Sequence, residues 1–194
     1  MARLPRSEFW DFSLELYGRE GVAPACLALQ ERHGADVNLL LFGCWLAASG
    51  RGPLEGAALA RAGASVEPWH REIVRGLRRT RASLRAGSAP LPAGAESDFL
   101  GYALELRKKV SAIELEAEHI EQLLLAAAAP ALAPAGAATP PLERARDAAR
   151  SAKAYLAALG APLDEGDRRQ LSAILAPLFP ALERGALDRL LAPG

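Results

Sequence analysis

The sequence predicts an all-α protein: a helical bundle with a central buried helix and a long antiparallel helical hairpin. Apolar residues recur with the helical period along almost the whole chain, and no run of β-branched residues alternates as a strand would. The run at 37–48 is apolar on every side of a helical wheel, which indicates burial by neighbouring helices. Two long helical patterns flank one short Gly/Pro-rich turn, which predicts the hairpin.

The bulk composition fits a globular chain and excludes a protein driven by its net charge. The chain has 194 residues, of which 51% are apolar and 24% are charged. Its 23 basic residues balance its 23 acidic residues, so no global field attracts nucleic acid or membrane. Any electrostatic function must therefore come from local segregation of charge.

The apolar segments are too short or too interrupted for export or membrane insertion. Acidic residues at Glu8, Asp11 and Glu15 break the N-terminal segment, which is untypical of a secretory signal. The run at 37–48 is shorter than the roughly 20 residues that a membrane-spanning helix needs. We therefore expect a cytoplasmic protein without a membrane span, in which Cys26 and Cys44 are reduced, buried and not metal-binding.

The first half of the chain divides into helices at recognisable caps. Ser7 caps a first helix that stops at Gly18, and a second helix covers about 23–32. Asp36 caps the apolar helix at 37–48, which Gly50, Gly52 and Pro53 terminate. A short helix is expected at 54–62, and Ser65 then precedes a long helix at 66–85 that carries Pro68 in its first turn.

A turn at 86–94 separates the helix at 66–85 from the longest helix, at about 96–128. Apolar residues follow a 4-3-4-3 spacing along this second helix, which predicts packing against another long helix at a shallow angle. These seam positions are Phe99, Ala103, Leu106, Val110, Ile113, Ala117, Ile120 and Leu124.

The domain organisation follows from a change of composition near residue 128. We expect a helical core domain at 5–127 and an Ala/Pro-rich linker at 128–141. A helical C-terminal region at 142–192 follows, either packed on the core domain or attached as an appendage.

Several segments resemble a bacterial conserved family of unknown function, made of short helical proteins. The resemblance covers about residues 7–125 and rests on an F-W-x-F-S-L start and the D-V-N-L-L-L-F helix. The segments W-H-R-E-I-V-R-G-L-R-R-T-R-A-S-L and E-L-E-A-E-H-I-E-Q-L-L-L extend it. The resemblance implies a bacterial, cytoplasmic, all-helical protein and brings no assigned activity, cofactor or catalytic residue.

One side of the helix at 66–85 carries a row of arginines opposite an apolar side. A guanidinium group forms paired hydrogen bonds with carboxylates and phosphates, so the row predicts binding of a partner or an anion. Because few aromatic residues accompany it, a base-stacking surface is not favoured. The residues we assign to this site are Arg71, Arg75, Arg78, Arg81 and Arg85, with Arg79 beside them.

A structural role competes with this interpretation. The next helix presents an acidic edge at Glu114, Glu118 and Glu121. In an antiparallel hairpin these glutamates would neutralise Arg71 and Arg75, and would leave Arg78, Arg79, Arg81 and Arg85 exposed.

Enzymatic interpretations have weaker support. Glu-x-x-His occurs at 67–70 and 116–119, as in di-metal helical bundles, but its members do not face a common interior on the helical wheel. The acidic edge also resembles helices that hold metal-bound diphosphate, although no second acidic motif faces it. We predict no catalytic residue, no metal site and no cofactor.

The sequence therefore predicts a non-enzymatic interaction or regulatory module that uses the arginine-rich face. Its expected partner is a protein, with nucleic acid as a weaker alternative. The alternative function is a helical-bundle enzyme that binds an anionic, diphosphate-like substrate through a metal held by the glutamates.

Overall fold

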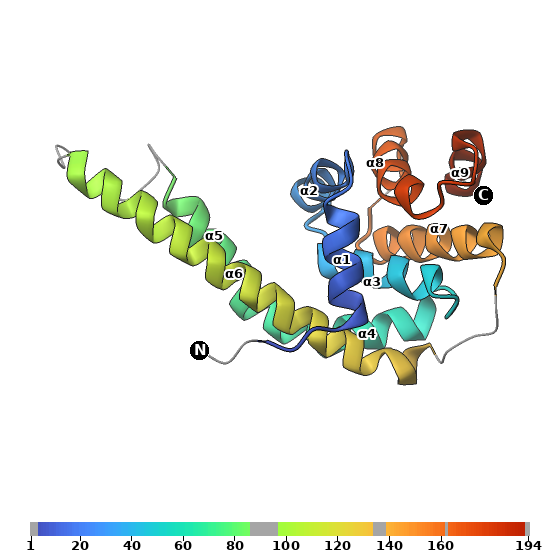
Figure 1. The fold of residues 1–194 in the computed structure, drawn as a ribbon, viewed down its shortest axis with the longest axis horizontal. Helices are drawn as coiled ribbons and strands as arrows, with labels where there is room; N and C mark the ends of the chain where they lie inside the picture. Colours follow the sequence, from blue (N-terminus) through green and yellow to red (C-terminus); the bar gives the residue numbers. More distant parts are fainter. Residues whose placement is uncertain (1–3, 86–96, 134–138, 162, 193–194) are drawn as a thin grey trace. The chain divides into compact units, whose positions relative to one another are not determined.

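The computed structural model describes residues 4–85, 97–133, 139–161 and 163–192, which contain helices and no strand (Figure 1). The fold is all-α, as predicted. The turn expected at 86–94 and the expected helix start at Glu96 lie outside the described residues. Within the described ranges, no helix combines the length and apolarity that crossing a membrane requires. The elements are α1 Glu8–Tyr17, α2 Val22–His33, α3 Val37–Ala48, α4 Gly56–Trp69, η1 His70–Val74, α5 Arg75–Ser83, α6 Ser97–Leu132, α7 Pro141–Ala158, α8 Glu165–Leu175, η2 Ala176–Leu178 and α9 Arg184–Leu191.

The chain forms two compact units. The core unit comprises Arg6–Ser65 and Gln122–Gly194, and the hairpin unit comprises Met1–Pro5 and Val66–Glu121. Helices α4 and α6 contribute residues to both units. The N-terminal helices α1–α3 and the C-terminal helices α7–α9 belong to the same unit.

Helix α3 is the centre of the core unit, and all its residues from Val37 to Ala47 are buried. The Asp36 carboxylate caps it by accepting the N–H of Asn38 at 2.9 Å, as the sequence predicts. Phe42 and Trp45 pack with Phe9 of α1, with ring centroids 5.3–5.8 Å apart. The one polar side chain of the helix, Asn38, accepts a buried hydrogen bond from Gln122 at 2.8 Å. The apolar run is therefore the hub of a packed core.

Both cysteines are part of this core. Cys26 and Cys44 are free thiols, and both are buried, as predicted. Burial raises the pKa of each thiol to about 12, so both stay protonated and behave as small apolar side chains.

Helix α7 lies antiparallel along α3 and contacts it at both ends (Figure 1). The Tyr155 hydroxyl accepts the backbone N–H of Asp36, where α3 begins, and Arg144 donates to the Ala48 carbonyl, where α3 ends. Between these contacts the two backbones lie close together at Gly43. A Cβ added to Gly43 would lie only 3.0 Å from the Cβ of Ser151. Several buried residues of α7 are small, namely Ala145, Ala148, Ala149, Ser151 and Ala152.

Polar contacts hold helices α8 and α9 against other helices of the core unit. Arg32 at the end of α2 donates to Asp164 and to the buried Asp167 at the start of α8. His33 lies 2.8 Å from the same Asp167 carboxylate. Lys153 of α7 donates to the carbonyls of Leu190 and Ala192 at the end of α9. The C-terminal region thus packs on the N-terminal helices of its unit.

Helices α4, η1 and α5 form one continuous helical segment, so the break predicted at Ser65 was wrong. Ser65 lies inside α4, where its hydroxyl donates to the Ala62 carbonyl at 2.7 Å instead of capping a new helix. Pro68 also lies inside α4, close to its end. The segment then widens into the five-residue π-helical turn η1 before α5 begins.

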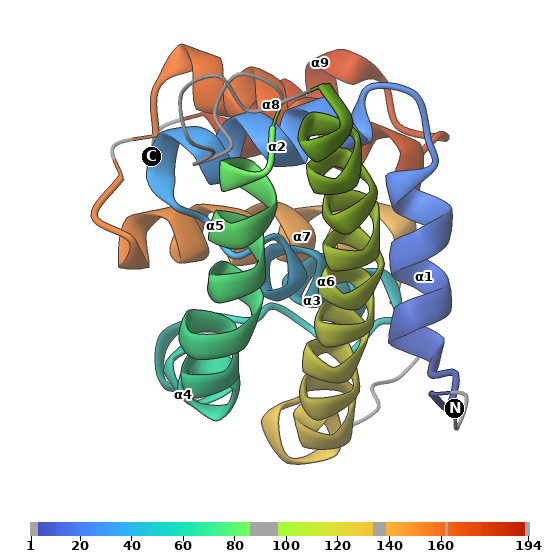
Figure 2. The same cartoon turned by 90° about the vertical axis from the view of Figure 1, so that its left-hand side faces the viewer.

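Helix α6 lies beside α5 in the hairpin unit (Figure 2), but its buried face is not the predicted apolar seam. Val110 and Ala117 are buried as expected, whereas Phe99, Leu106 and Ile113 are exposed. Glu114, His119 and Glu121 are buried as well, and side chains across the hairpin pair with the two glutamates. Helix α6 continues through 128–132, which belong to the predicted linker, because alanine favours the helical conformation. Residues 134–138 of the predicted linker lie outside the described residues.

Candidate functional site: the arginine face of the hairpin unit

The basic helix α5 is attached to α6 by an arginine–glutamate cluster. Arg81 donates from Nη2 to Glu114 Oε1 at 3.0 Å and from Nε to the other oxygen of the same carboxylate. Arg78 donates to Glu118 Oε1 at 2.5 Å, and its Nε lies 3.5 Å from Glu114. The hydrogen bond to Glu114 raises the pKa of Arg81 above its ordinary value. We call these four residues the hairpin clamp.

The clamp corrects the predicted assignment of charge partners. Arg78 and Arg81 were expected to be exposed, but their guanidinium groups are engaged by the acidic edge. Arg71 was expected to reach that edge, but it pairs instead with Glu67 at 2.6 Å and Glu72 at 2.7 Å in its own helical segment. The hydrogen bonds to Glu72 and Glu67 raise the pKa of Arg71 above its ordinary value. The hydrogen bond that Glu72 accepts from Arg71 lowers the pKa of Glu72.

The π-helical turn η1 is the physical reason for this error. A π-helix takes more residues per turn than an α-helix, so residues after it are rotated relative to an ideal α-helical wheel. Val74 is fully buried, whereas Ile73, which an ideal wheel places on the apolar side, is 39% exposed. The same rotation turns Arg78 and Arg81 towards α6.

The outward surface of this segment carries the arginines that the hairpin unit does not use internally. Arg75, Arg79 and Arg85 are exposed. Within the described ranges none of them forms an ion pair, in contrast to Arg71, Arg78 and Arg81. We call Arg75, Arg79 and Arg85 the outer arginines. Their side chains are free to bind a carboxylate or a phosphate from another molecule.

The third residue of the acidic edge has a different partner. Glu121 is fully buried, and its carboxylate lies 3.1 Å from Nδ1 of His70, the first residue of η1. Next to it, the Trp69 indole donates to the Ala117 carbonyl at 2.9 Å. These contacts fix the start of η1 on α6 inside the hairpin unit.

In each of the two Glu-x-x-His motifs, the glutamate and the histidine lie in different surroundings. Glu67 is exposed and bound by Arg71, whereas His70 lies against Glu121. Glu116 is exposed, whereas His119 is 8% exposed. Glu114 and Glu118 are occupied by guanidinium groups, so this geometry lends no support to a metal-held diphosphate at the acidic edge.

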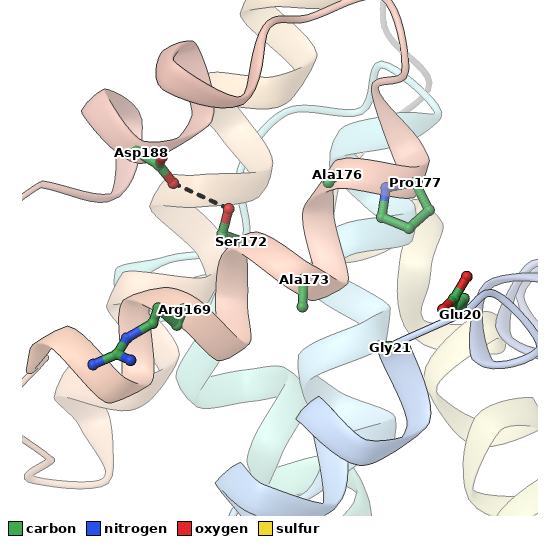
Figure 3. A pocket seen from close by; sticks show the side chains of 8 residues that line it. All are labelled: Glu20, Gly21, Arg169, Ser172, Ala173, Ala176, Pro177 and Asp188. Carbon is green, nitrogen blue, oxygen red and sulfur yellow. Dashed lines mark hydrogen bonds between the residues drawn. The ribbon is translucent and has the colours of Figure 1, made fainter.

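A pocket in the core unit was not anticipated from the sequence. It has a volume of about 570 Å³ and lies between the α1–α2 turn and helices α8 and α9 (Figure 3). Ser172 donates to Asp188 at 3.1 Å on one side, and Glu20 lies on the other, with Ala173 between them. The lining supplies carboxylates, one guanidinium and one hydroxyl, but neither histidine nor cysteine. This composition suits a polar ligand better than nucleophilic catalysis.

Neither the pocket lining nor the pairing of His70 with Glu121 could be predicted from the sequence. The pocket lining comes from three separate segments, so no local motif marks it. The His70–Glu121 contact joins residues 51 positions apart. The one sequence signal for it is that Glu121 belongs to the acidic edge expected to face the other helix of the hairpin. Small residues repeated along α7 were a usable signal for its close packing on α3.

Comparison with known proteins places the chain in a family without adding a mechanism. A family model described as a protein of unknown function, DUF2390, matches residues 8–125. No curated protein sequence and no solved structure shows significant similarity to the chain. The match spans α1 to most of α6 and so contains the hairpin clamp and the outer arginines. The chain therefore belongs to the DUF2390 family of proteins of unknown function.

Proposed function

We propose that this protein is a non-enzymatic interaction module whose outer arginines bind an acidic segment of a protein partner. The observation that carries the proposal is the division of the arginines between two roles. Arg78 and Arg81 are held by glutamates of α6, whereas Arg75, Arg79 and Arg85 are exposed without an ion pair in the described parts of the chain. An exposed guanidinium group keeps its full capacity for paired hydrogen bonds to a carboxylate.

The surroundings of the outer arginines favour a protein partner over nucleic acid. Glu67 and Glu72 are exposed on the same helical segment, where Arg71 binds both. A surface of mixed charge repels parts of a continuous phosphate backbone but can complement a protein surface that also carries both signs. The nearest aromatic residue of the segment, Trp69, is half-buried with its indole N–H engaged, which disfavours base stacking.

The test is affinity capture of partners with a charge-reversal variant chosen from the structure. Arg75→Glu, Arg79→Glu and Arg85→Glu together reverse the outer arginines and leave the hairpin clamp intact. The matched control reverses three exposed arginines of the core unit, Arg19, Arg61 and Arg146, so both variants carry the same net charge. We expect the first variant to lose the captured protein and the control to retain it, with both folded by circular dichroism.

Nuclease treatment of the lysate separates the two classes of partner. Capture that survives nuclease and disappears with the outer-arginine variant supports the proposal. Capture that disappears with nuclease assigns the surface to nucleic acid, and equal capture by the wild type and the outer-arginine variant contradicts any role for this surface.

A further inference from the structure

We infer that the exposed apolar side of α6 is a self-association surface, on which the same helix of a second copy packs antiparallel. The side chains that define it are Phe99, Tyr102, Leu106 and Ile113, which are 52%, 69%, 50% and 52% exposed. Soluble proteins seldom leave large apolar side chains exposed together along one helix unless another surface covers them. This surface is separate from the outer arginines, which lie on α5 and just after its end.

The spacing of these residues is that of a helix-packing seam. They lie at 99, 102, 106 and 113, and the exposed charges Lys109 and Glu116 complete a 3-4-3-4-3 series. Such a series forms one stripe along a helix. The side of α6 that faces α5 is a different one, marked by Val110, Glu114, Ala117 and Glu121, so the hairpin does not cover the stripe.

The charges on the stripe identify the occupant as a second copy in antiparallel orientation. In a parallel pair in register, Lys109 would face Lys109 and Glu116 would face Glu116, which is repulsive. In an antiparallel pair centred near Ile113, Lys109 of each copy faces Glu116 of the other, and this ion pair occurs twice. The seven-residue separation places each ion pair roughly 5 Å along the helix from the symmetry axis.

The apolar residues are self-complementary in the same arrangement. Ile113 meets its own copy at the centre, and Leu106 of one helix comes opposite Ile120 of the other. The aromatic pair Phe99 and Tyr102, with centroids 6.3 Å apart, extends the contact at each end.

Other occupants fit the stripe less well. An acidic protein segment needs a basic surface, whereas the stripe carries one exposed charge of each sign, Lys109 and Glu116. An anionic membrane surface attracts helices with a predominantly basic polar face, which the balanced charges do not provide.

The experiment is sedimentation equilibrium of the full-length chain, with variants that reverse the stripe charges. We expect a wild-type dimer at micromolar concentration. Lys109→Glu and Glu116→Lys should each raise the dimer dissociation constant by about tenfold, because each single change creates two like-charge contacts. The double variant Lys109→Glu/Glu116→Lys should restore it to within about twofold. Lys108→Glu, which lies on another side of α6, is the matched control and should have little effect.

A second variant tests the apolar centre. Ile113→Asp should give a folded monomer, because its side chain is exposed in the single chain and buried only in the dimer. A wild-type chain that sediments as a monomer at all concentrations would overturn the inference, as would a double charge variant that dissociates like the single ones. The measurement uses purified chain alone, so its outcome is independent of partner binding by the outer arginines.

Discussion

The hydroxyl of Tyr155 in α7 accepts the backbone N–H of Asp36 at 2.6 Å, at the residue that caps the buried helix α3. Tyr155 lies outside the segment that matches the family model, whereas Asp36 lies inside it. The same helix α7 donates to the last carbonyl of α3 through Arg144. The C-terminal region therefore completes both ends of the helix at the centre of the family segment.

Removing the Tyr155 hydroxyl should destabilise the core unit. Tyr155→Phe deletes the acceptor of a buried hydrogen bond, which typically costs about 1–3 kcal/mol of unfolding free energy. Urea denaturation followed by circular dichroism measures the change. Tyr102→Phe is the control, because Tyr102 is 69% exposed and should be neutral in the monomer. Equal stabilities of the two variants would contradict a supporting role for the Tyr155 contact.

A methyl group at Gly43 should push α3 and α7 apart. The added Cβ would lie 3.0 Å from Ser151 Cβ, so we expect Gly43→Ala to cost about 1–3 kcal/mol. In a Ser151→Gly background, Gly43→Ala should cost less than it does in the wild type, because that background lacks the opposing Cβ. Gly101→Ala in α6 is the control: its Cβ meets open space, so stability should rise by about 0.5–1 kcal/mol. A neutral Gly43→Ala would show that the helices are not closely packed there.

Breaking the hairpin clamp should destabilise the hairpin unit. Arg81→Met removes the bidentate hydrogen bond that Arg81 donates to the Glu114 carboxylate. The Glu114 side chain is only 9% exposed. We expect a loss of about 1–3 kcal/mol, as for a buried charged group that loses a hydrogen-bond donor. Arg79→Met removes an exposed arginine from the same helix and should change stability by less than about 0.5 kcal/mol. Hydrogen exchange of α5 and α6 amides reports the difference; equal protection in both variants would refute the clamp.

The ion cluster between α2 and α8 should make the core unit sensitive to acid. The hydrogen bond from Arg32, with a backbone N–H from Asp167, holds the pKa of Asp164 well below its ordinary value. The unfolded state then binds the proton more tightly, so this contribution is complete above roughly pH 5 and is lost as the pH falls below about 4.

Arg32→Gln tests this origin of the acid sensitivity. The variant should lose less stability than the wild type between neutral pH and about pH 3, in urea midpoints measured at both. Arg19→Gln, which removes an exposed ion pair with Glu15, should keep the wild-type pH dependence. If Arg32→Gln also keeps it, Arg32 is not the cause.

The sequence was sufficient for the features that depend on local chemistry. Ser7 and Asp36 were identified as helix caps, and each accepts the expected backbone N–H. The run at 37–48 was identified as a buried helix because apolar residues surround it on every side. These features need no knowledge of a distant residue.

The predictions that were wrong concern side chains whose neighbours in the folded structure cannot be inferred from sequence periodicity. A wheel assigned Arg78 and Arg81 to solvent because it could not include the π-helical turn at His70–Val74. The apolar seam was placed on Ile113 and Leu106, although pairing with arginine and histidine allows Glu114 and Glu121 to be buried instead. The docking of α7 on α3 likewise depends on contacts more than 90 residues apart, such as Arg144 with Ala48.

The central claim is that the arginines of one helical segment have separate roles, with Arg78 and Arg81 holding the hairpin and Arg75, Arg79 and Arg85 binding the partner. The most direct measurement is the dissociation constant of the captured acidic partner for wild type and for the Arg75→Gln/Arg79→Gln/Arg85→Gln variant. The account predicts an increase of about tenfold or more with unchanged unfolding free energy, and a weaker wild-type affinity at high salt. An unchanged dissociation constant, or a loss of affinity that accompanies unfolding of the hairpin unit, would contradict it.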